Sequence, residues 1–267
     1  MPSDETILIT GADGTIGSRL RHSLRRPGRH LRLLDLMTQA PLEDGEDAEL
    51  IVGSFLDPEL MSQACAGADT VIHLAGLSSG GFTWAEYLDV NIDGTHVVLE
   101  AARQARVARV IYASSNHAVG FHPFDADHLT PDYLYPRPDS FYGVSKVASE
   151  GLCSLYHDRY GLDTICLRIG SYRERPDNLR TLWSWLSPGD CTRLFEAAIS
   201  TPQPGFRVVW GVSANRRGIV SLAGARAIGY EPLDDAETFA HEITGSGDRS
   251  SSNGELLGGP YTAPTFE

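Results

Sequence analysis

The sequence predicts an α/β protein with a doubly wound parallel sheet of about seven strands. Short apolar, β-branched runs recur along the 267-residue chain, and stretches with helical spacing separate them. That alternation is typical of parallel sheets with helices on both faces. The first run also enters a glycine-rich turn that continues into a helix. Together these observations favour one large nucleotide-binding type of fold.

Composition limits the classes of partner. The chain has 42% hydrophobic and 21% charged residues and a net charge of −13. A strongly acidic balance argues against nucleic acid and anionic membrane surfaces as partners. No apolar run reaches the roughly 18 residues of a membrane span, and no signal peptide is visible at the start. Four scattered cysteines fit the reduced thiols of a cytoplasmic protein.

The elements follow in order along the chain. We expect strands at 6–10, 31–35, 50–53, 70–74, 107–113, 163–168 and 206–211. Helices are expected at 18–26, 58–65, 84–106, 141–160, 189–200 and 236–244. The whole chain, 1–267, is predicted to be a single domain whose nucleotide-binding core lies mainly over 5–170. A small substrate lobe is expected from 76–83, 115–140, 171–188 and 211–267.

The turn after the first strand carries three glycines. Gly11 permits a tight turn, Gly14 lets the backbone approach a pyrophosphate, and Gly17 allows close packing of helix on strand. Backbone N–H groups at the helix start then face the phosphates. A strand, a glycine turn and a helix in this order predict a Rossmann-type dinucleotide site.

Asp35 ends the second strand, 18 residues beyond Gly17. A carboxylate about 20 residues after the turn accepts hydrogen bonds from a ribose 2′-hydroxyl and repels a 2′-phosphate. No Arg or Lys follows within 36–39. We therefore predict NAD rather than NADP as the cofactor. The plainer alternative is that Asp35 only ends the strand.

Tyr142 and Lys146 stand four residues apart in a predicted helix, so their side chains share one face. An ammonium beside a phenol favours the phenolate, which predicts a Tyr142 pKa below its usual value of about 10. Such a tyrosine can exchange a proton with a substrate hydroxyl, and Ser115 can orient that hydroxyl. An ordinary exposed helix pair is the alternative. No metal is expected: His73 reads as a core histidine, and His122 and His128 fit no closed ligand set.

These motifs together resemble the extended short-chain dehydrogenase/reductase family, of which the NAD-dependent epimerases and dehydratases form part. The matching positions are Gly11, Gly14, Gly17, Asp35, Asn91, Ser115, Tyr142 and Lys146. Within that family, residues 113–117, 137–146, 167–171, 180–186 and 208–215 are similar to uronate dehydrogenases. At this level the resemblance covers nearly the whole chain.

The resemblance implies NAD-dependent oxidation of a hexuronic acid, such as glucuronate or galacturonate, at C1 to the aldarolactone. Tyr142 would take the anomeric hydroxyl proton, Lys146 would lower the pKa of Tyr142 and hold the nicotinamide ribose, and Ser115 would position the substrate oxygen. Asn91 would support a proton relay. A homo-oligomer is also implied, paired through the helices that begin near 84 and 141.

The resemblance also assigns binding residues. For NAD they are Gly11, Asp13, Gly14, Thr15, Ile16, Gly17, Asp35, Ser54, Phe55, Leu74, Ala75, Gly76, Asn91, Ser114, Tyr142, Lys146 and Ile169. For the uronic acid they are Ser78, Ser79, Ser115, Asn116, His117, Tyr142, Ser171 and Arg180. Arg180 offers a bidentate fork for the substrate carboxylate; the alternatives are a solvated loop residue or an intersubunit contact.

Two features depart from the family pattern. Ser54 stands where an acid commonly contacts the adenine, so that contact is weaker or remade. Only 121 residues follow Lys146, which favours a monosaccharide over a nucleotide-linked sugar. Two other functions stay open here: an epimerase or dehydratase that retains its NAD, and a non-catalytic dinucleotide sensor that has no need for Tyr142, Lys146 and Ser115 together.

Overall fold

A computed structural model of the chain describes residues 5–37, 40–78, 80–124, 128–245 and 256–266. Seven parallel strands form one sheet in the order β3-β2-β1-β4-β5-β6-β9. The seven strands are β1 Glu5–Thr10, β2 Arg29–Asp35, β3 Ala48–Val52, β4 Thr70–His73, β5 Arg109–Ser115, β6 Asp163–Ile169 and β9 Phe206–Gly211. The expected doubly wound parallel sheet is confirmed.

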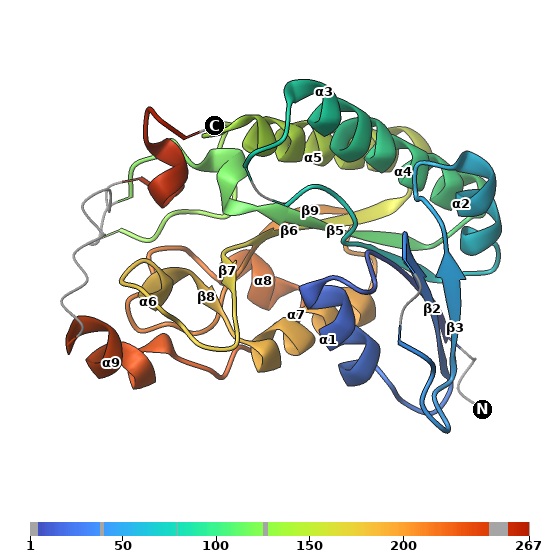
Figure 1. The fold of residues 1–267 in the computed structure, drawn as a ribbon, viewed down its shortest axis with the longest axis horizontal. Coiled ribbons are helices and arrows are strands. Elements are labelled where there is room, and N and C mark those ends of the chain that lie inside the picture. The colour runs from blue at the N-terminus through green and yellow to red at the C-terminus, as the bar shows by residue number, and fades with distance from the viewer. Residues whose placement is uncertain (1–4, 38–39, 79, 125–127, 246–255, 267) are drawn as a thin grey trace.

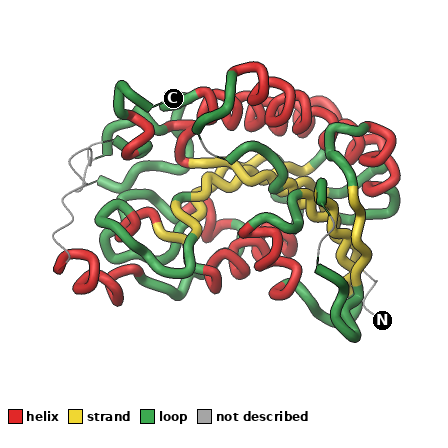
Figure 2. Tube along the Cα trace, viewed as in Figure 1, coloured by secondary structure: helices red, strands yellow, loops and turns green. Residues whose placement is uncertain are grey.

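Helices cover both faces of the sheet (Figures 1 and 2). On one face lie α2 Pro58–Cys65, α4 Gly94–Gln104 and α5 Phe141–Tyr160; on the other lie α1 Thr15–Ser23, α7 Pro188–Ser200 and α8 Ala223–Ala227. Side chains of β1 alternate between the two cores that result. Ile7 and Ile9 pack toward α1 and α7, whereas Leu8 packs toward α2 and α4. Alternation on a central strand is what burial of both faces requires.

Helix α5 spans the residues expected from the sequence, and local chemistry fixes both of its ends. The Ser140 hydroxyl oxygen accepts a hydrogen bond from the Gly143 N–H over 3.1 Å, which caps the first turn. Gly161 ends the helix in the left-handed conformation at φ 73°. This helix carries Tyr142 and Lys146 across the carboxyl ends of β5 and β6.

Several element boundaries differ from the sequence expectation. The single helix expected over 84–106 is three segments: α3 Trp84–Glu86, a π-helical turn Tyr87–Asp93, and α4. Helix α1 begins at Thr15 rather than 18, because Gly14 serves as its N-cap. The helix expected over 236–244 is a 3₁₀ turn, Ala236–Phe239, followed by α9 Ala240–Gly245.

The insert after β6 is also more ordered than expected. It holds α6 Thr181–Ser184 and a two-stranded parallel sheet of β7 Ser171–Tyr172 and β8 Trp185–Leu186. Short elements of two to four residues leave no periodic signal in a sequence. The same holds for α8 and for the 3₁₀ turn Asn116–Val119 that follows β5.

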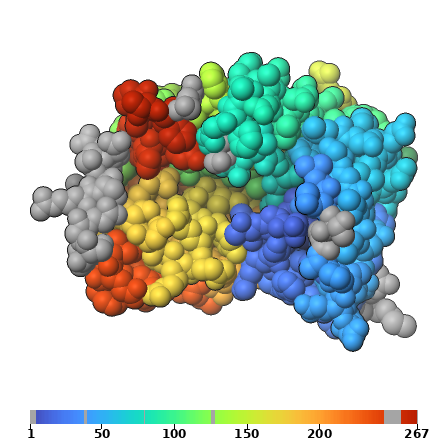
Figure 3. Space-filling model, viewed as in Figure 1, coloured from blue at the N-terminus to red at the C-terminus, as the bar shows by residue number. Residues whose placement is uncertain are grey.

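The C-terminal segment, 256–266, lies against the loop that follows β5, far from it in sequence (Figure 1). The Leu257 N–H donates to the His122 carbonyl over 3.0 Å, and the Gly258 N–H donates to the Gly120 carbonyl over 2.9 Å. In the space-filling view this segment borders a hollow between the teal helices and the blue and yellow segments (Figure 3). That hollow contains the site described below.

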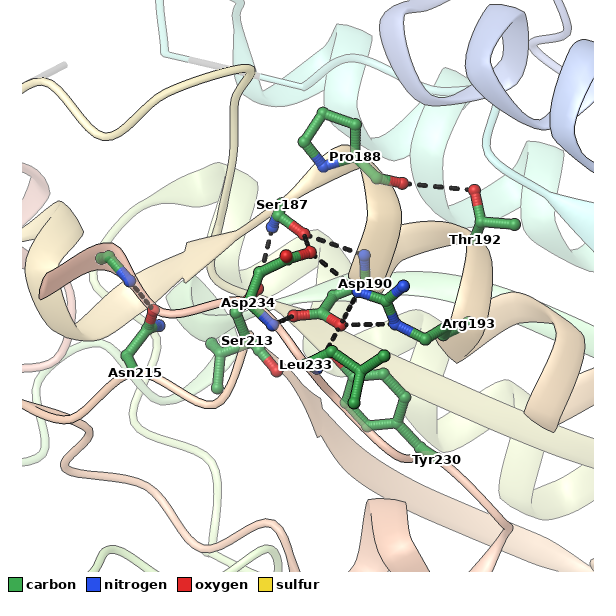
Figure 4. A network of polar contacts seen from close by, with 12 residues as sticks. Ser187, Pro188, Asp190, Thr192, Arg193, Ser213, Asn215, Tyr230, Leu233 and Asp234 are labelled. Atoms are coloured by element: carbon green, nitrogen blue, oxygen red, sulfur yellow. Dashed lines mark hydrogen bonds and ion pairs between the residues drawn. The ribbon is translucent and has the colours of Figure 1, made fainter. Parts of the chain in front are cut away.

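A buried polar network fastens the later part of the chain to α7 (Figure 4). The Asp190 side chain is wholly buried and accepts from Arg193 Nε over 2.8 Å, from the Leu233 N–H over 2.8 Å and from the Asp234 N–H over 3.0 Å. The Ser187 hydroxyl oxygen accepts from the Asp190 N–H and its hydrogen is donated to Asp234. Asp190 therefore anchors the segment at Leu233 and Asp234 to α7.

Within the described ranges, no helix combines the length and apolar character that crossing a membrane demands. All four cysteines, which are Cys65, Cys153, Cys166 and Cys191, are buried free thiols. Burial raises the pKa of Cys65 and of Cys191 to about 12, so both thiols stay protonated near neutral pH.

Candidate active site

A cleft of about 580 Å³ opens at the carboxyl edge of the sheet, where ligands bind in open α/β folds. Most residues predicted for NAD line it. These are Gly11, Asp13, Gly14, Thr15, Ile16, Gly17, Asp35, Phe55, Leu74, Ala75, Gly76, Ser114, Tyr142, Lys146 and Ile169. Of the residues predicted for the substrate, Ser78, Ser115 and His117 line the same cleft, together with Tyr142, which is predicted for both ligands. Ser79 lies outside the described residues.

The glycine turn has the geometry that its sequence predicts. Gly11 has φ 72°, and a side chain there would meet the Ala75 backbone nitrogen at 2.7 Å. A side chain at Gly17 would meet the Gly11 carbonyl oxygen at 2.3 Å, so only glycine allows α1 to pack this closely. Gly14 caps α1 without a side-chain hydrogen bond, which leaves N–H groups of the first turn directed toward an anionic ligand.

Two residues predicted to contact NAD do not line the cleft. The Ser54 hydroxyl oxygen accepts from the Leu56 N–H over 3.1 Å, and its neighbour Phe55 faces the cleft instead. Asn91 is buried in the π-helical turn, where its amide pairs with both backbone groups of Leu77 over 2.8 and 3.0 Å. Its Nδ2 also donates to Ser145 Oγ over 2.9 Å. Asn91 therefore fixes the backbone of the loop that follows β4.

Ser115, Tyr142 and Lys146 come together beside the cleft. Ser115 ends β5, and its hydroxyl lies near the Tyr142 phenol, where it acts to lower the pKa of the phenol. Lys146 Nζ donates to the Ala113 carbonyl over 2.8 Å and lies 5.5 Å from the Tyr142 ring centroid. The Tyr112 ring lies 4.8 Å from the same ammonium. Burial lowers the pKa of Lys146 to about 8, and the nearby Glu150 carboxylate opposes that shift.

The expected direction of the Tyr142 pKa is wrong. Burial of the phenol raises its pKa above the usual value, and the nearby Ser115 hydroxyl only partly opposes this. A lowered pKa would require the ammonium to lie at the phenol oxygen. Instead Lys146 lies over the ring and is bonded to the β5 backbone. Tyr142 is therefore a protonated phenol near neutral pH.

A buried ion pair between Arg168 and Glu150 lies one helical turn from Lys146. Arg168 donates to Glu150 through Nε over 2.9 Å and through Nη2 over 2.7 Å. Ser114 Oγ donates to the same carboxylate over 2.6 Å. Glu150 stands one helical turn after Lys146, so the bidentate pair ties α5 to β6 and the Ser114 hydrogen bond ties it to β5. Sequence reasoning missed both members of this pair.

A second cavity of about 400 Å³ meets the first at His117, which lines both. Ser171 and Arg180, both predicted for the substrate, line it. Arg180 Nη1 donates to Ser171 Oγ over 3.0 Å, and Nη2 donates to the Leu257 carbonyl over 3.1 Å. Its Nε is buried without a hydrogen-bond partner among the described residues. Burial lowers the pKa of Arg180 to about 10, so the guanidinium stays charged at neutral pH.

Asn116 has a different place from the one expected. Its side chain is buried, lines neither cavity, and donates through Nδ2 to the Leu257 carbonyl over 3.0 Å. Arg180 donates to the same oxygen, so two predicted substrate residues hold the C-terminal segment in place. That segment lines the second cavity with residues that sequence reasoning did not single out, namely Leu256, Gly258, Gly259, Pro260 and Tyr261.

Two histidines outside the first cleft, His73 and His122, have structural partners. His73 is a core residue, as expected: Nδ1 hydrogen-bonds Thr10 Oγ1 at 2.8 Å, and Nε2 hydrogen-bonds Thr95 Oγ1 at 3.2 Å. His122 Nε2 bonds the Tyr135 carbonyl at 2.8 Å. Across the parts of the chain that the structure describes, no three His, Cys, Asp or Glu side chains are grouped as metal ligands.

Known proteins resemble the chain throughout its length. A profile of the NAD dependent epimerase/dehydratase family matches residues 7–172. A uronate dehydrogenase of Pseudomonas putida is 40% identical over 233 residues, which are 87% of this chain and 85% of that enzyme. The crystal structure of a uronate dehydrogenase from Agrobacterium tumefaciens superposes with a TM-score of 0.89 at 34% identity over 98% of both chains. A tyrosine-to-alanine variant of the A. tumefaciens enzyme, complexed with NAD, superposes equally well, with a TM-score of 0.89 at 34% identity over 98% of this chain and 99% of that one.

Proposed function

The chain belongs to the NAD-dependent epimerase/dehydratase family, and we propose that it oxidises a hexuronic acid at C1 to the aldarolactone with NAD. One observation carries this proposal beyond the family. Arg180, a buried cation with an unpartnered N–H, lines a cavity that joins the Ser115–Tyr142 pair through His117. A carboxylate at one end of a sugar and a reacting hydroxyl at the other match that arrangement.

The residues of the first cleft fit NAD. The start of α1, which has no side-chain cap, and the close backbone approach allowed by Gly14 suit a pyrophosphate. The Asp35 carboxylate faces the cleft, where it suits a ribose 2′-hydroxyl and disfavours a 2′-phosphate. When bound, NAD supplies the hydride acceptor.

Tyr142 is the proposed base for the anomeric hydroxyl proton, because its phenol lies near Ser115 at the wall of the cleft. Burial keeps the phenol protonated in the resting site, so the phenolate forms only if nearby positive charge and hydrogen bonds stabilise it. The Lys146 ammonium and the Ser115 hydroxyl supply both. Ser115 also orients the sugar oxygen toward Tyr142.

Arg180 is proposed to bind the C6 carboxylate. Its Nη1 and Nη2 each use one N–H for Ser171 and Leu257, so each keeps a second N–H for the substrate, and Ser171 Oγ stands beside Nη1 as a further polar contact. Hydrogen bonds to ionised groups contribute roughly 1.5–3 kcal/mol each. The acidic surface elsewhere makes a specific interior cation necessary for an anionic sugar.

The deciding experiment measures NADH formation with free sugars. Glucuronate, galacturonate and mannuronate are assayed against glucose and galactose, with NAD and with NADP. We expect NADH from uronic acids and little from the neutral sugars. An enzyme that converts a nucleotide-linked sugar with no net NADH, and leaves free uronates untouched, would be the NAD-retaining epimerase or dehydratase. A protein that binds NAD and turns over neither would be a sensor.

We propose that the enzyme acts in the cytoplasm as a homo-oligomer. The buried cysteines are free thiols, which is compatible with the reducing environment of the cytoplasm. Trp84 and Phe141 are both about two-fifths exposed, and their rings contact each other at 5.6 Å between centroids. Leu88, four residues after Trp84 in the π-helical turn, is also exposed and adds apolar surface. Light scattering tests the assembly: we expect twice the chain mass for the wild type and the single chain mass for Leu88→Glu.

A further inference from the structure

The imidazole of His117 is held on three sides. Its Nδ1 lies 2.7 Å from Asp139 Oδ2. The Tyr261 ring stacks on one face at 3.8 Å between centroids, with 29° between planes. The Tyr142 ring approaches edge-on at 5.8 Å. Because His117 lines both cavities, this ring is fixed at the place where the reacting end and the carboxylate end of a substrate meet.

The Asp139 carboxylate that holds Nδ1 is itself rigidly placed. Its side chain is fully buried, and Oδ1 accepts from the Ser140 hydroxyl over 2.9 Å. Glycines lie on two sides of it: a side chain at Gly120 or at Gly258 would come within 1.8 or 1.9 Å of Oδ2. These glycines belong to segments far apart in the sequence. The close approach of both backbones leaves the carboxylate a single position.

A carboxylate only accepts hydrogen bonds, so its partner Nδ1 carries the hydrogen. Burial lowers the pKa of His117, and the Arg180 guanidinium adds to this, while Asp139 opposes it. The ring is therefore neutral at neutral pH, and Nε2 has a free lone pair. No group in the described part of the chain hydrogen-bonds Nε2.

We propose that Asp139 is a positioning residue: it fixes His117 as the Nδ1–H tautomer, so that Nε2 accepts a hydrogen bond from a sugar hydroxyl between the anomeric carbon and the carboxylate. This rests on the proposed function for the identity of the sugar. Tyr261 completes the arrangement, because its ring blocks rotation of the imidazole. Phe266 covers the other face of Tyr261 at 3.9 Å and keeps that ring in place.

The consequence for specificity is direct. A sugar whose hydroxyl meets Nε2 gains a hydrogen bond, whereas a deoxy or O-methyl sugar leaves a buried acceptor unpaired. Among the proposed substrates this site selects for the presence of a hydroxyl donor, and Arg180 selects for the carboxylate.

The tautomer can be read without any turnover. Long-range ¹H–¹⁵N spectra of the ¹⁵N-labelled enzyme distinguish protonated from unprotonated ring nitrogens, and the His117→Gln spectrum identifies the signals. We expect Nδ1–H with Nε2 unprotonated. In Asp139→Asn the amide oxygen accepts from Ser140 and the NH₂ faces Nδ1, so the hydrogen moves to Nε2. A wild-type ring protonated on Nε2 overturns the proposal.

Kinetics supply the second readout. We expect Asp139→Asn to lower kcat/KM for uronates roughly tenfold to a hundredfold, with NAD binding unchanged. In the His117→Gln background the same substitution should cost nothing further. Equal losses in both backgrounds would mean that Asp139 acts on stability and not through His117. If the tautomer is as expected but no uronate is oxidised, the proposed function fails and the positioning role of Asp139 stands.

Should Asp139→Asn fail to fold, Tyr261→Leu carries the same test. Loss of the stacked ring frees the imidazole to rotate while Asp139 stays in place. We expect a lower kcat/KM for uronates with the Nδ1–H tautomer retained. Unchanged kinetics in this variant would show that the ring is held by other means and would contradict the role given to Tyr261.

Discussion

The Asp35 carboxylate accepts a hydrogen bond from the Asp13 backbone N–H over 2.9 Å. The end of β2 and the glycine turn after β1 are thereby joined across the cleft floor. The other carboxylate oxygen accepts from the Leu36 N–H over 2.8 Å. These two bonds fix the orientation of a carboxylate that faces the cofactor cleft, so its role is preorganised rather than dependent on a flexible side chain.

Replacing Asp35 should change the choice of cofactor. We expect Asp35→Ser to lower kcat/KM with NAD by about tenfold to a hundredfold, because one charge-assisted hydrogen bond to the ribose is lost. Activity with NADP should rise, since the repulsion of a 2′-phosphate disappears. Steady-state kinetics with both cofactors measure this. Asp44→Ser, an exposed acid nearby, is the control, and an unchanged NAD preference would remove Asp35 from the ribose site.

Tyr142→Phe removes the proposed base and keeps the ring. General acid–base groups contribute about 10²–10⁴ in rate, so we expect kcat to fall at least a hundredfold with NAD binding retained. Tyr160→Phe, on the exposed end of the same helix, is the matched control and should keep full activity. Substantial turnover by Tyr142→Phe would assign the proton transfer to another group.

The parts of the fold with strong local signals were predictable. The limits of α5 follow from the Ser140 cap and Gly161, and β9 follows from a β-branched run, all of which are visible in sequence. The π-helical turn was not. It contains Asn91, whose amide hydrogen-bonds the backbone of Leu77 in the loop after β4. A helix-period pattern does not distinguish a wide turn from an ordinary one.

The same division holds in the site. Cleft residues on motifs, such as Gly11 and Asp35, were placed from spacing alone, and the cavity lining agrees with them. The cavity wall formed by 256–266 was not assigned residue by residue, because its contacts join residues far apart in the sequence. Gly258, for example, hydrogen-bonds Gly120. Asp139 lies within a recognised motif, yet its partner His117 is 22 positions away. Only the fold brings them together.

Arg180 should decide between anionic and neutral sugars. We expect Arg180→Lys to raise KM for glucuronate about tenfold or more, because an ammonium cannot reproduce the guanidinium fork. Glucose and galactose, which lack the carboxylate, should show little change. Arg175→Lys, an exposed arginine paired with Glu242, is the control. A loss shared equally by uronates and neutral sugars would instead indicate that Arg180 only holds Leu257 and Ser171.

The Asp190 network should matter for stability and not for chemistry. Removing one partner of a buried charged network costs roughly 3–5 kcal/mol, so Asp190→Ala should lower the free energy of unfolding by about that amount. Urea denaturation measures it. Asp44→Ala, an exposed acid, should change stability by less than about 0.5 kcal/mol. A small effect at Asp190 would mean that the segment after β9 is held mainly by apolar packing.

Acid stability should depend on His73. Burial lowers the pKa of this imidazole to about 3, and the nearby Lys146 adds to the effect. Between its usual pKa of 6.5 and about 3, the unfolded chain binds a proton that the folded protein excludes. Stability from this source is therefore complete above 6.5 and is lost as the pH falls. At about pH 5 the loss amounts to about 2 kcal/mol.

Unfolding midpoints in urea, followed from about pH 7 to about pH 4, test this directly. His73→Gln loses the two threonine hydrogen bonds and starts from a lower stability, so the slope with pH, and not the absolute value, is the quantity compared. We expect a shallower slope than in the wild type. His22→Gln, at an exposed position on α1, should keep the wild-type slope. Parallel curves for the wild type and His73→Gln would show that other groups govern acid unfolding.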